Sequence, residues 1–178
     1  MAGPTTDAGA ADAVTARPPI PDEILGPRLI AIGRRLPSRA ILAIGEGLLA
    51  GGVRAFEVTL DSDSGLASLE LLAGRLGPAG LLVGAGTVLD VESAARARDA
   101  GAQFIVAPHT DAAVVQFAAG NGIPAFPGAF TPTEMLVAWR AGASAVKLFP
   151  ASAVGPTFVR ELRGPFRDIP LIPTGGVT

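Results

Sequence analysis

Residues 144–151 have the sequence SAVKLFPA, an apolar run that contains one lysine, Lys147. This is the single lysine of the chain, because the other 13 of its 14 basic residues are arginines. The run follows the helix-stop sequence AGA (141–143) and ends at a proline, an arrangement typical of a short strand between a helix and a loop. The sequence therefore predicts a buried strand that carries one amine.

The same arrangement recurs along the chain from Pro27 onward. Apolar runs alternate with Ala- and Leu-rich stretches that end in glycine, about every 20–26 residues. Runs that are apolar on both faces suit strands of a buried parallel sheet, and the stretches between them suit helices. The predicted strands are LIAI (29–32), AFEVTL (55–60), LLVGAG (81–86), FIVAP (104–108), PAFPG (124–128), AVKLFP (145–150) and PLIPTGG (170–176).

Residues of the type that cap helices precede several of the predicted helices. Ser38, Asp90, Asp111 and Thr131 are expected to begin helices, and Thr131 with Glu134 has the spacing of a capping box.

Repeated strand–helix units predict an α/β fold with parallel strands, either a (β/α)8 TIM barrel or a doubly wound sheet. The second architecture is less favoured, because VGAGTVL (83–89) contains G-x-G without the third glycine of a dinucleotide-binding turn. We therefore expect a TIM barrel with about seven strands in this chain. Residues 1–26 are predicted to form a disordered tail, and residues 27–178 a barrel domain that lacks its last strand–helix unit.

The composition excludes several classes of function. The net charge is −2 without a basic run, so we expect no nucleic-acid partner, and no apolar run has membrane-spanning length, so we expect no membrane partner. The absence of cysteine excludes disulfides and thiolate sites and is consistent with a cytoplasmic location. One histidine and scattered carboxylates predict no metal site.

Glu57 and Lys147 are the strongest candidates for catalysis. Side chains alternate along a strand, so both residues can point into the barrel if their strands share one closed sheet. Burial favours the neutral amine, which can attack a carbonyl carbon to form a Schiff base, and a nearby carboxyl group can transfer protons. A buried ion pair between the two residues, which would only fix their register, is the alternative interpretation.

Other polar and glycine residues follow the ends of the strands. His109 is a candidate general base or a bystander in its loop. The stretch 84–87 and the pair Gly175 and Gly176 are candidates for anion binding through backbone N–H groups, or for tight turns that require glycine.

Six motifs, in this order and spacing, resemble those of the KDPG/KHG aldolases, the 2-keto-3-deoxy-6-phosphogluconate aldolases of the (β/α)8-barrel class. They are FEVTL, VGAGTVL, AGAQFIVAP, VKLFPAS, GPF and PTGGV, and the resemblance extends from about Leu29 to Thr178. SAVGP (152–156) and LDS (60–62) are also similar to the sister 6-phosphogalactonate aldolases.

The resemblance implies a role for each matched residue. Lys147 would form the Schiff base with the keto carbon, and Glu57 would be the general acid and base. Arg34, or Arg35 as the alternative, would bind the substrate carboxylate, and Thr87 would contact the pyruvyl group. Gly175 and Gly176 would bind the phosphate. Pro108 and Phe149 would line the pocket.

The implied reaction is reversible cleavage of 2-keto-3-deoxy-6-phosphogluconate to pyruvate and glyceraldehyde 3-phosphate, without a metal or organic cofactor. The implied partners are a phosphorylated keto sugar acid and pyruvate, and the family is typically trimeric, so we expect a homotrimer. The galactonate epimer and 4-hydroxy-2-oxoglutarate are alternative substrates.

Two features of this sequence differ from the family pattern. Many members have an arginine where this chain has Asp61, a charge that would repel an anionic substrate. Family chains also continue through an eighth strand, whereas this sequence ends at Thr178, so we expect an incomplete barrel. A non-catalytic barrel is therefore a third interpretation.

Overall fold

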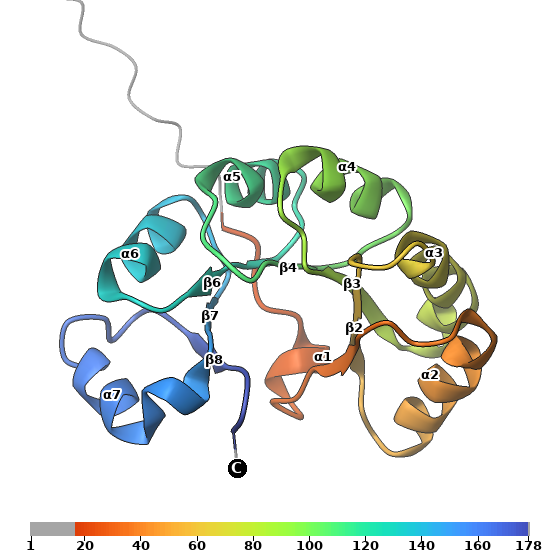
Figure 1. The fold of residues 1–178 in the computed structure, drawn as a ribbon, viewed down its shortest axis with the longest axis horizontal. Coiled ribbons are helices and arrows are strands. Elements are labelled where there is room, and N and C mark those ends of the chain that lie inside the picture. Colours follow the sequence, from red (N-terminus) through yellow and green to blue (C-terminus); the bar gives the residue numbers. More distant parts are fainter. Residues whose placement is uncertain (1–16, 178) are drawn as a thin grey trace, which may run out of the picture.

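The computed structural model describes residues 17–177, in which parallel strands line the inside of an arc of helices (Figure 1). Every predicted apolar run overlaps a strand, and all strand pairs are parallel, which confirms the α/β barrel-type fold. The strands are β1 (Ala31–Gly33), β2 (Ala55–Thr59), β3 (Leu82–Gly86), β4 (Ile105–Val106), β5 (Ala125–Phe126), β6 (Gly128–Ala129), β7 (Val146–Leu148) and β8 (Leu171–Pro173).

Helices connect successive strands on the outside of the arc (Figure 1). They are α2 (Ile41–Ala50), α3 (Gly65–Leu76), α4 (Val91–Asp99), α5 (Ala112–Gly120), α6 (Pro132–Arg140) and α7 (Gly155–Leu162). A short helix, α1 (Asp22–Leu25), precedes β1, and the 3-10 turns are η1 (Ser38–Ala40), η2 (Gly77–Ala79) and η3 (Ala151–Ala153). Within residues 17–177, no helix combines the length and apolar character needed to cross a bilayer.

Three of the predicted helix caps are confirmed. The Asp90 carboxylate accepts a hydrogen bond from the Ser93 backbone N–H at 2.6 Å, and Asp111 caps α5 in the same way. Thr131 and Glu134 form the predicted capping box at the start of α6. The prediction for Ser38 was wrong, because this residue begins a 3-10 turn after Pro37 and its side chain caps nothing.

The fifth predicted strand is divided into β5 and β6 at Pro127. Proline has no backbone N–H, so it cannot continue the hydrogen-bonded ladder as a donor. Its carbonyl still accepts a hydrogen bond from the Lys147 N–H at 2.9 Å. The Ser144 and Phe149 N–H groups bind the carbonyls of Ala125 and Ala129 on either side, so the pairing with β7 continues across the break.

The alternation of side chains along the strands creates two apolar layers. Residues on the outer face pack against the helices and include Phe56, Val58, Val83, Ala85 and Ile105. A second, smaller cluster fills the inside of the barrel and contains Ala55, Leu82, Phe104, Val106, Phe126 and Ala145, with Ile24 of α1 packed against it. Glu57 and Lys147 each lie two residues beyond an alanine of the inner cluster, so they belong to the inner face.

Residues 17–26, assigned to the tail by the sequence analysis, are packed against the barrel. The Arg17 guanidinium lies 3.3 Å from the centre of the Trp139 ring and donates hydrogen bonds to the carbonyls of Trp139 and Ala143. The buried Ser144 hydroxyl donates to the Pro18 carbonyl at 2.6 Å. These contacts order the segment, which then leads into α1; the rest of the predicted tail, residues 1–16, lies outside the described residues.

The barrel is open on one side. Within residues 17–177 no hydrogen-bonded ladder joins β8 to β1, and the chain after β8 runs beside this opening (Figure 1).

Two glycines of α2 provide a matched test of the helix packing. A methyl group on Gly45 would lie 2.5 Å from Leu76 Cδ1 and 2.9 Å from Leu72 Cδ2, whereas a methyl group on Gly47 would meet nothing within 4 Å. We expect Gly47→Ala to raise the free energy of unfolding by about 0.5–1 kcal/mol, through helix propensity alone. Gly45→Ala should lower it by about 1–2 kcal/mol through overpacking against α3. Urea unfolding followed by circular dichroism measures both, and equal effects would contradict the close packing of α2 on α3.

Candidate active site

Lys147 is the central residue of β7, and its side chain is only 8% exposed. Its register partner on β6 is Gly128, which contributes no side chain to the barrel interior. The carbonyl of Pro108, at the end of β4, packs against Gly128 where a side chain would otherwise project. Pro108 therefore lies one strand away from Lys147, across β6.

Glu57 is the central residue of β2, and its side chain is 3% exposed. It pairs in register with Ile32 on β1 and Gly84 on β3. Gly84 has no side chain because the Phe104 ring occupies that space, and Gly86 likewise faces the Glu57 carboxyl group. The inner face of β3 therefore leaves room for the carboxyl group of its neighbour.

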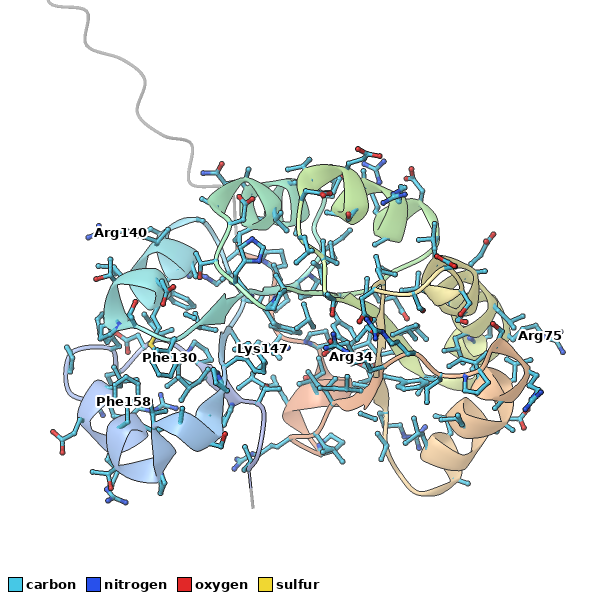
Figure 2. The ribbon with its side chains drawn as sticks, in the orientation of Figure 1. Arg34, Arg75, Phe130, Arg140, Lys147 and Phe158 are labelled. Carbon is cyan, nitrogen blue, oxygen red and sulfur yellow. The ribbon has the colours of Figure 1, made fainter. Side chains whose placement is uncertain are left out.

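Glu57 and Lys147 line one cavity of about 880 Å³ inside the barrel. Apolar side chains of the N-terminal segment, including Ile20 and Ile24, form part of its wall. Gly175 and Gly176 line the same cavity from the loop after β8. Figure 2 shows Lys147 and Arg34 toward the centre of the arc, whereas Arg75 and Arg140 project from its outside.

The two catalytic candidates do not form an ion pair. No salt bridge within 4.0 Å among residues 17–177 joins the Lys147 amine to the Glu57 carboxylate, and neither group makes a side-chain hydrogen bond to a described residue. Burial raises the pKa of the Glu57 carboxyl above its ordinary value, although the positive charges of Lys147 and Arg34 oppose that rise. The interpretation of this pair as a register-fixing salt bridge is therefore not supported by the geometry.

Phe149 and Thr87 lie near the catalytic candidates but outside the lining of the cavity. The Lys147 Nζ atom lies 5.2 Å from the centre of the Phe149 ring, a cation–π distance. Thr87 follows β3 with φ of 57°, a left-handed conformation that is unusual for a threonine. It is joined directly to Gly86, the residue in contact with the Glu57 carboxyl group.

The glycine pair after β8 forms a tight turn against η3. Gly175 and Gly176 have φ of 86° and 65°, conformations that favour glycine. A side chain on Gly175 would meet the Phe149 ring at 3.2 Å, and one on Gly176 would meet Ser152 Cβ at 2.7 Å. The turn therefore requires glycine for both its conformation and its packing, and its backbone is exposed to the cavity.

Arg34 and Arg35 converge on Asp61. Oδ2 of Asp61 lies 2.8 Å from Arg34 Nη2 and 3.2 Å from Arg35 Nε. Two consecutive side chains reach one carboxylate because Arg35 adopts φ of 50°, which turns the chain after β1. The nearby Thr59 hydroxyl, followed by the two arginine charges, lowers the pKa of Asp61.

The pairing of Asp61 with both arginines was not predicted from the sequence, because it joins residues up to 27 positions apart along the chain. The sequence analysis also assigned no role to Ile20 and Ile24, which line the cavity. His109 is exposed and does not line the cavity, so the structure does not bring it to the catalytic candidates. Within residues 17–177 no group of three or more His, Asp or Glu side chains has the arrangement of a metal site.

The arrangement is suited to imine chemistry. A buried primary amine, a carboxyl group with a raised pKa and a cavity for a small carbonyl compound are the groups that Schiff-base catalysis requires.

Comparisons with known proteins find relatives that are named as aldolases. The chain is 40% identical over 151 residues to the probable 2-dehydro-3-deoxy-6-phosphogalactonate aldolase of Rhizobium meliloti (strain 1021), covering 84% of this chain and 71% of the relative. It is also 40% identical over 139 residues to the 2-dehydro-3-deoxy-phosphogluconate aldolase of Pseudomonas aeruginosa, covering 78% of this chain and 62% of the relative. The chain therefore spans less than two thirds of the length of the second protein.

A solved structure shares the fold at higher coverage. The KDPG aldolase of Legionella pneumophila, with pyruvate captured at low pH as a covalent carbinolamine intermediate, matches with a TM-score of 0.78 and 28% identity, over 92% of this chain and 74% of that one. The model of the family described as KDPG and KHG aldolase matches residues 25–178. With the family model covering nearly all of the chain, this protein belongs to the KDPG and KHG aldolase family.

Proposed function

We propose that this chain carries the active site of a class I aldolase, which cleaves a 2-keto-3-deoxy-6-phospho sugar acid to pyruvate and glyceraldehyde 3-phosphate. The observation that supports it most directly is the Lys147 amine in the same cavity as the Glu57 carboxyl group, without an ion pair between them. The carbinolamine described for the Legionella pneumophila aldolase supports the same chemistry.

In the proposed reaction, the neutral Lys147 amine attacks the C2 carbonyl carbon of the substrate. The resulting carbinolamine loses water, after proton transfer to its oxygen, and becomes an iminium ion. The C3–C4 bond then breaks, and its electron pair moves toward the iminium nitrogen to form an enamine. The C4 hydroxyl loses its proton as this bond breaks, and glyceraldehyde 3-phosphate leaves. Protonation of the enamine at C3 and hydrolysis then release pyruvate and the free amine.

Glu57 supplies the proton transfers in this proposal. Its raised pKa keeps a fraction of the carboxyl group protonated at higher pH than for an exposed glutamate, so it can donate as well as accept. Lys147 and Arg34 limit the rise, which favours a group that cycles between both states. Thr87, next to Gly86 at the carboxyl end of β3, is proposed to contact the pyruvyl group.

The two anionic ends of the substrate are assigned to two sites, of which only the glycine turn lines the cavity. We place the carboxylate near Arg34, whose positive charge already acts on Glu57 inside the barrel. The phosphate is placed at Gly175 and Gly176, where backbone N–H groups in a glycine turn can bind an anion. Phe149 and Pro108 are proposed to limit the cavity between these ends.

Between the two epimers, the galactonate is favoured by one observation. The relative from Rhizobium meliloti, which aligns over more of both chains than the gluconate enzyme of Pseudomonas aeruginosa at the same identity, is a probable galactonate aldolase. KDPG is the second candidate substrate.

Substitution of the lysine tests the proposed chemistry. Lys147→Arg should abolish turnover, because a guanidinium stays protonated and forms no imine. Borohydride reduction with pyruvate should place a stable adduct on Lys147 in the unsubstituted protein, read by peptide mass spectrometry, and none in the variant. The absence of an adduct in unsubstituted protein that is folded by circular dichroism would favour the non-catalytic interpretation.

The raised pKa of Glu57 predicts a pH-dependent stability. Near pH 4 the carboxyl group is largely protonated in the folded and unfolded chains, whereas at higher pH only the unfolded chain ionises freely. The stability of the unsubstituted protein should therefore fall as pH rises through the folded pKa, and Glu57→Gln should become progressively more stable relative to it. Urea unfolding from pH 4 to pH 8 measures the difference. Exposed Glu46→Gln is the control, and the same trend in both variants would contradict the assignment to Glu57.

The choice of substrate can be measured directly. We expect cleavage of both epimers to the same products, with the higher kcat/KM for the galactonate. Product formation is followed by coupled reduction of pyruvate. Preference for the gluconate would reverse the assignment, and cleavage of neither, with adduct formation intact, would restrict the proposal to pyruvate-binding chemistry.

A further inference from the structure

Gly86 lies directly against the side chain of Glu57, the proposed acid–base group. It is the last residue of β3 and pairs in register with Thr59 of β2. A methyl group added to Gly86 would lie 2.6 Å from both Cγ and Cδ of Glu57 and closer still to its Oε1 atom. All three of the nearest atoms belong to Glu57, so the missing side chain of Gly86 provides space for this carboxyl group.

The backbone around Gly86 is fixed on both sides. Its carbonyl accepts a hydrogen bond from the Leu60 N–H at 2.9 Å, which ties it to the end of β2. Two residues later, the Val88 N–H donates to the Val106 carbonyl at 3.2 Å, which ties the loop to β4. A methyl group at position 86 would therefore displace the Glu57 side chain rather than the strand.

Glu57 has little else to hold its carboxyl group. The carboxylate accepts no hydrogen bond and forms no salt bridge within the described part of the chain. Its location depends on the space that the surrounding atoms leave, and Gly86 forms one wall of that space. We propose that Gly86 is a positioning residue, which sets the place of the Glu57 carboxyl group relative to the substrate carbon attached to Lys147.

This inference depends on the proposed aldolase function, and it separates two parts of the reaction. Imine formation requires the Lys147 amine, which Gly86 does not contact. Proton exchange at the methyl carbon of bound pyruvate requires a positioned base. That base removes a proton as the C–H electron pair moves toward the iminium nitrogen, and a deuteron from solvent is then returned to the same carbon. Displacing the carboxyl group should impair the second part far more than the first, in which Glu57 only assists the loss of water from the carbinolamine.

The test compares Gly86→Ala with the unsubstituted protein in D2O. We expect deuterium exchange into the methyl group of pyruvate, followed by NMR, to fall at least about tenfold, because general acid–base catalysis contributes about 10²–10⁴-fold. Borohydride trapping of pyruvate on Lys147 should stay within about twofold of that in the unsubstituted protein. A small decrease is expected because part of the general-acid assistance by Glu57 would be lost. Gly74→Ala is the control, because a methyl group there meets nothing within 4 Å, and it should change neither rate.

The outcomes separate the inference from the function on which it depends. Normal trapping with unchanged exchange in Gly86→Ala would overturn the positioning role alone, and loss of trapping in that variant would overturn it too. No trapping in the unsubstituted protein would overturn the proposed function and the inference with it. If Gly86→Ala does not fold, Glu57→Ala and the double variant decide the matter. Equal free energies of unfolding in Glu57→Ala and the double variant would support the contact between Gly86 and Glu57. A lower free energy of unfolding in the double variant would contradict that contact.

Discussion

The site depends on keeping an amine and a carboxyl group inside an apolar barrel without letting them neutralise each other. Burying either charge alone is costly, and direct contact would be the simplest way to offset that cost. Here Lys147 and Glu57 instead face a shared cavity from strands of two different sheets, β7 and β2. Among residues 17–177, the Lys147 amine therefore has no carboxylate within 4.0 Å.

The apolar layer below these groups makes the separation possible. Ala55 and Ala145 precede them on their strands, and the rings of Phe104 and Phe126 fill the lower interior with their centres 5.8 Å apart. The two phenylalanine rings fill the lower part of the interior, and glycines without side chains leave space nearer the top. Gly84 accommodates a ring from β4, and the next inward position of β3 accommodates a carboxyl group from β2. β3 therefore provides a packing position at Gly84 and space for the proposed acid–base group at its next inward position.

The sequence predicted those parts of the fold that depend on local pattern. The period of two placed Glu57 and Lys147 on one face, and glycine after each helix located the strands that follow. It did not predict the division of the fifth strand at Pro127, where a missing N–H interrupts the ladder although the neighbouring pairing continues. It also assigned residues 17–26 to the tail, because the contact of Arg17 with Trp139 joins positions 122 residues apart and has no local signature.

The Arg34, Arg35 and Asp61 cluster shows the surroundings of the aspartate that stands in place of the family arginine. A single aspartate in place of an arginine suggests repulsion of an anionic substrate. In the structure, its carboxylate lies 2.8 and 3.2 Å from two guanidinium groups, so the cluster carries a net charge of one positive unit. Arg34 and Arg35 are largely exposed, so water and salt weaken the pairing energy, and the geometry matters more than the attraction. Asp61 then acts by restricting the directions of two long side chains, and the remaining N–H donors of Arg34 are available to a carboxylate.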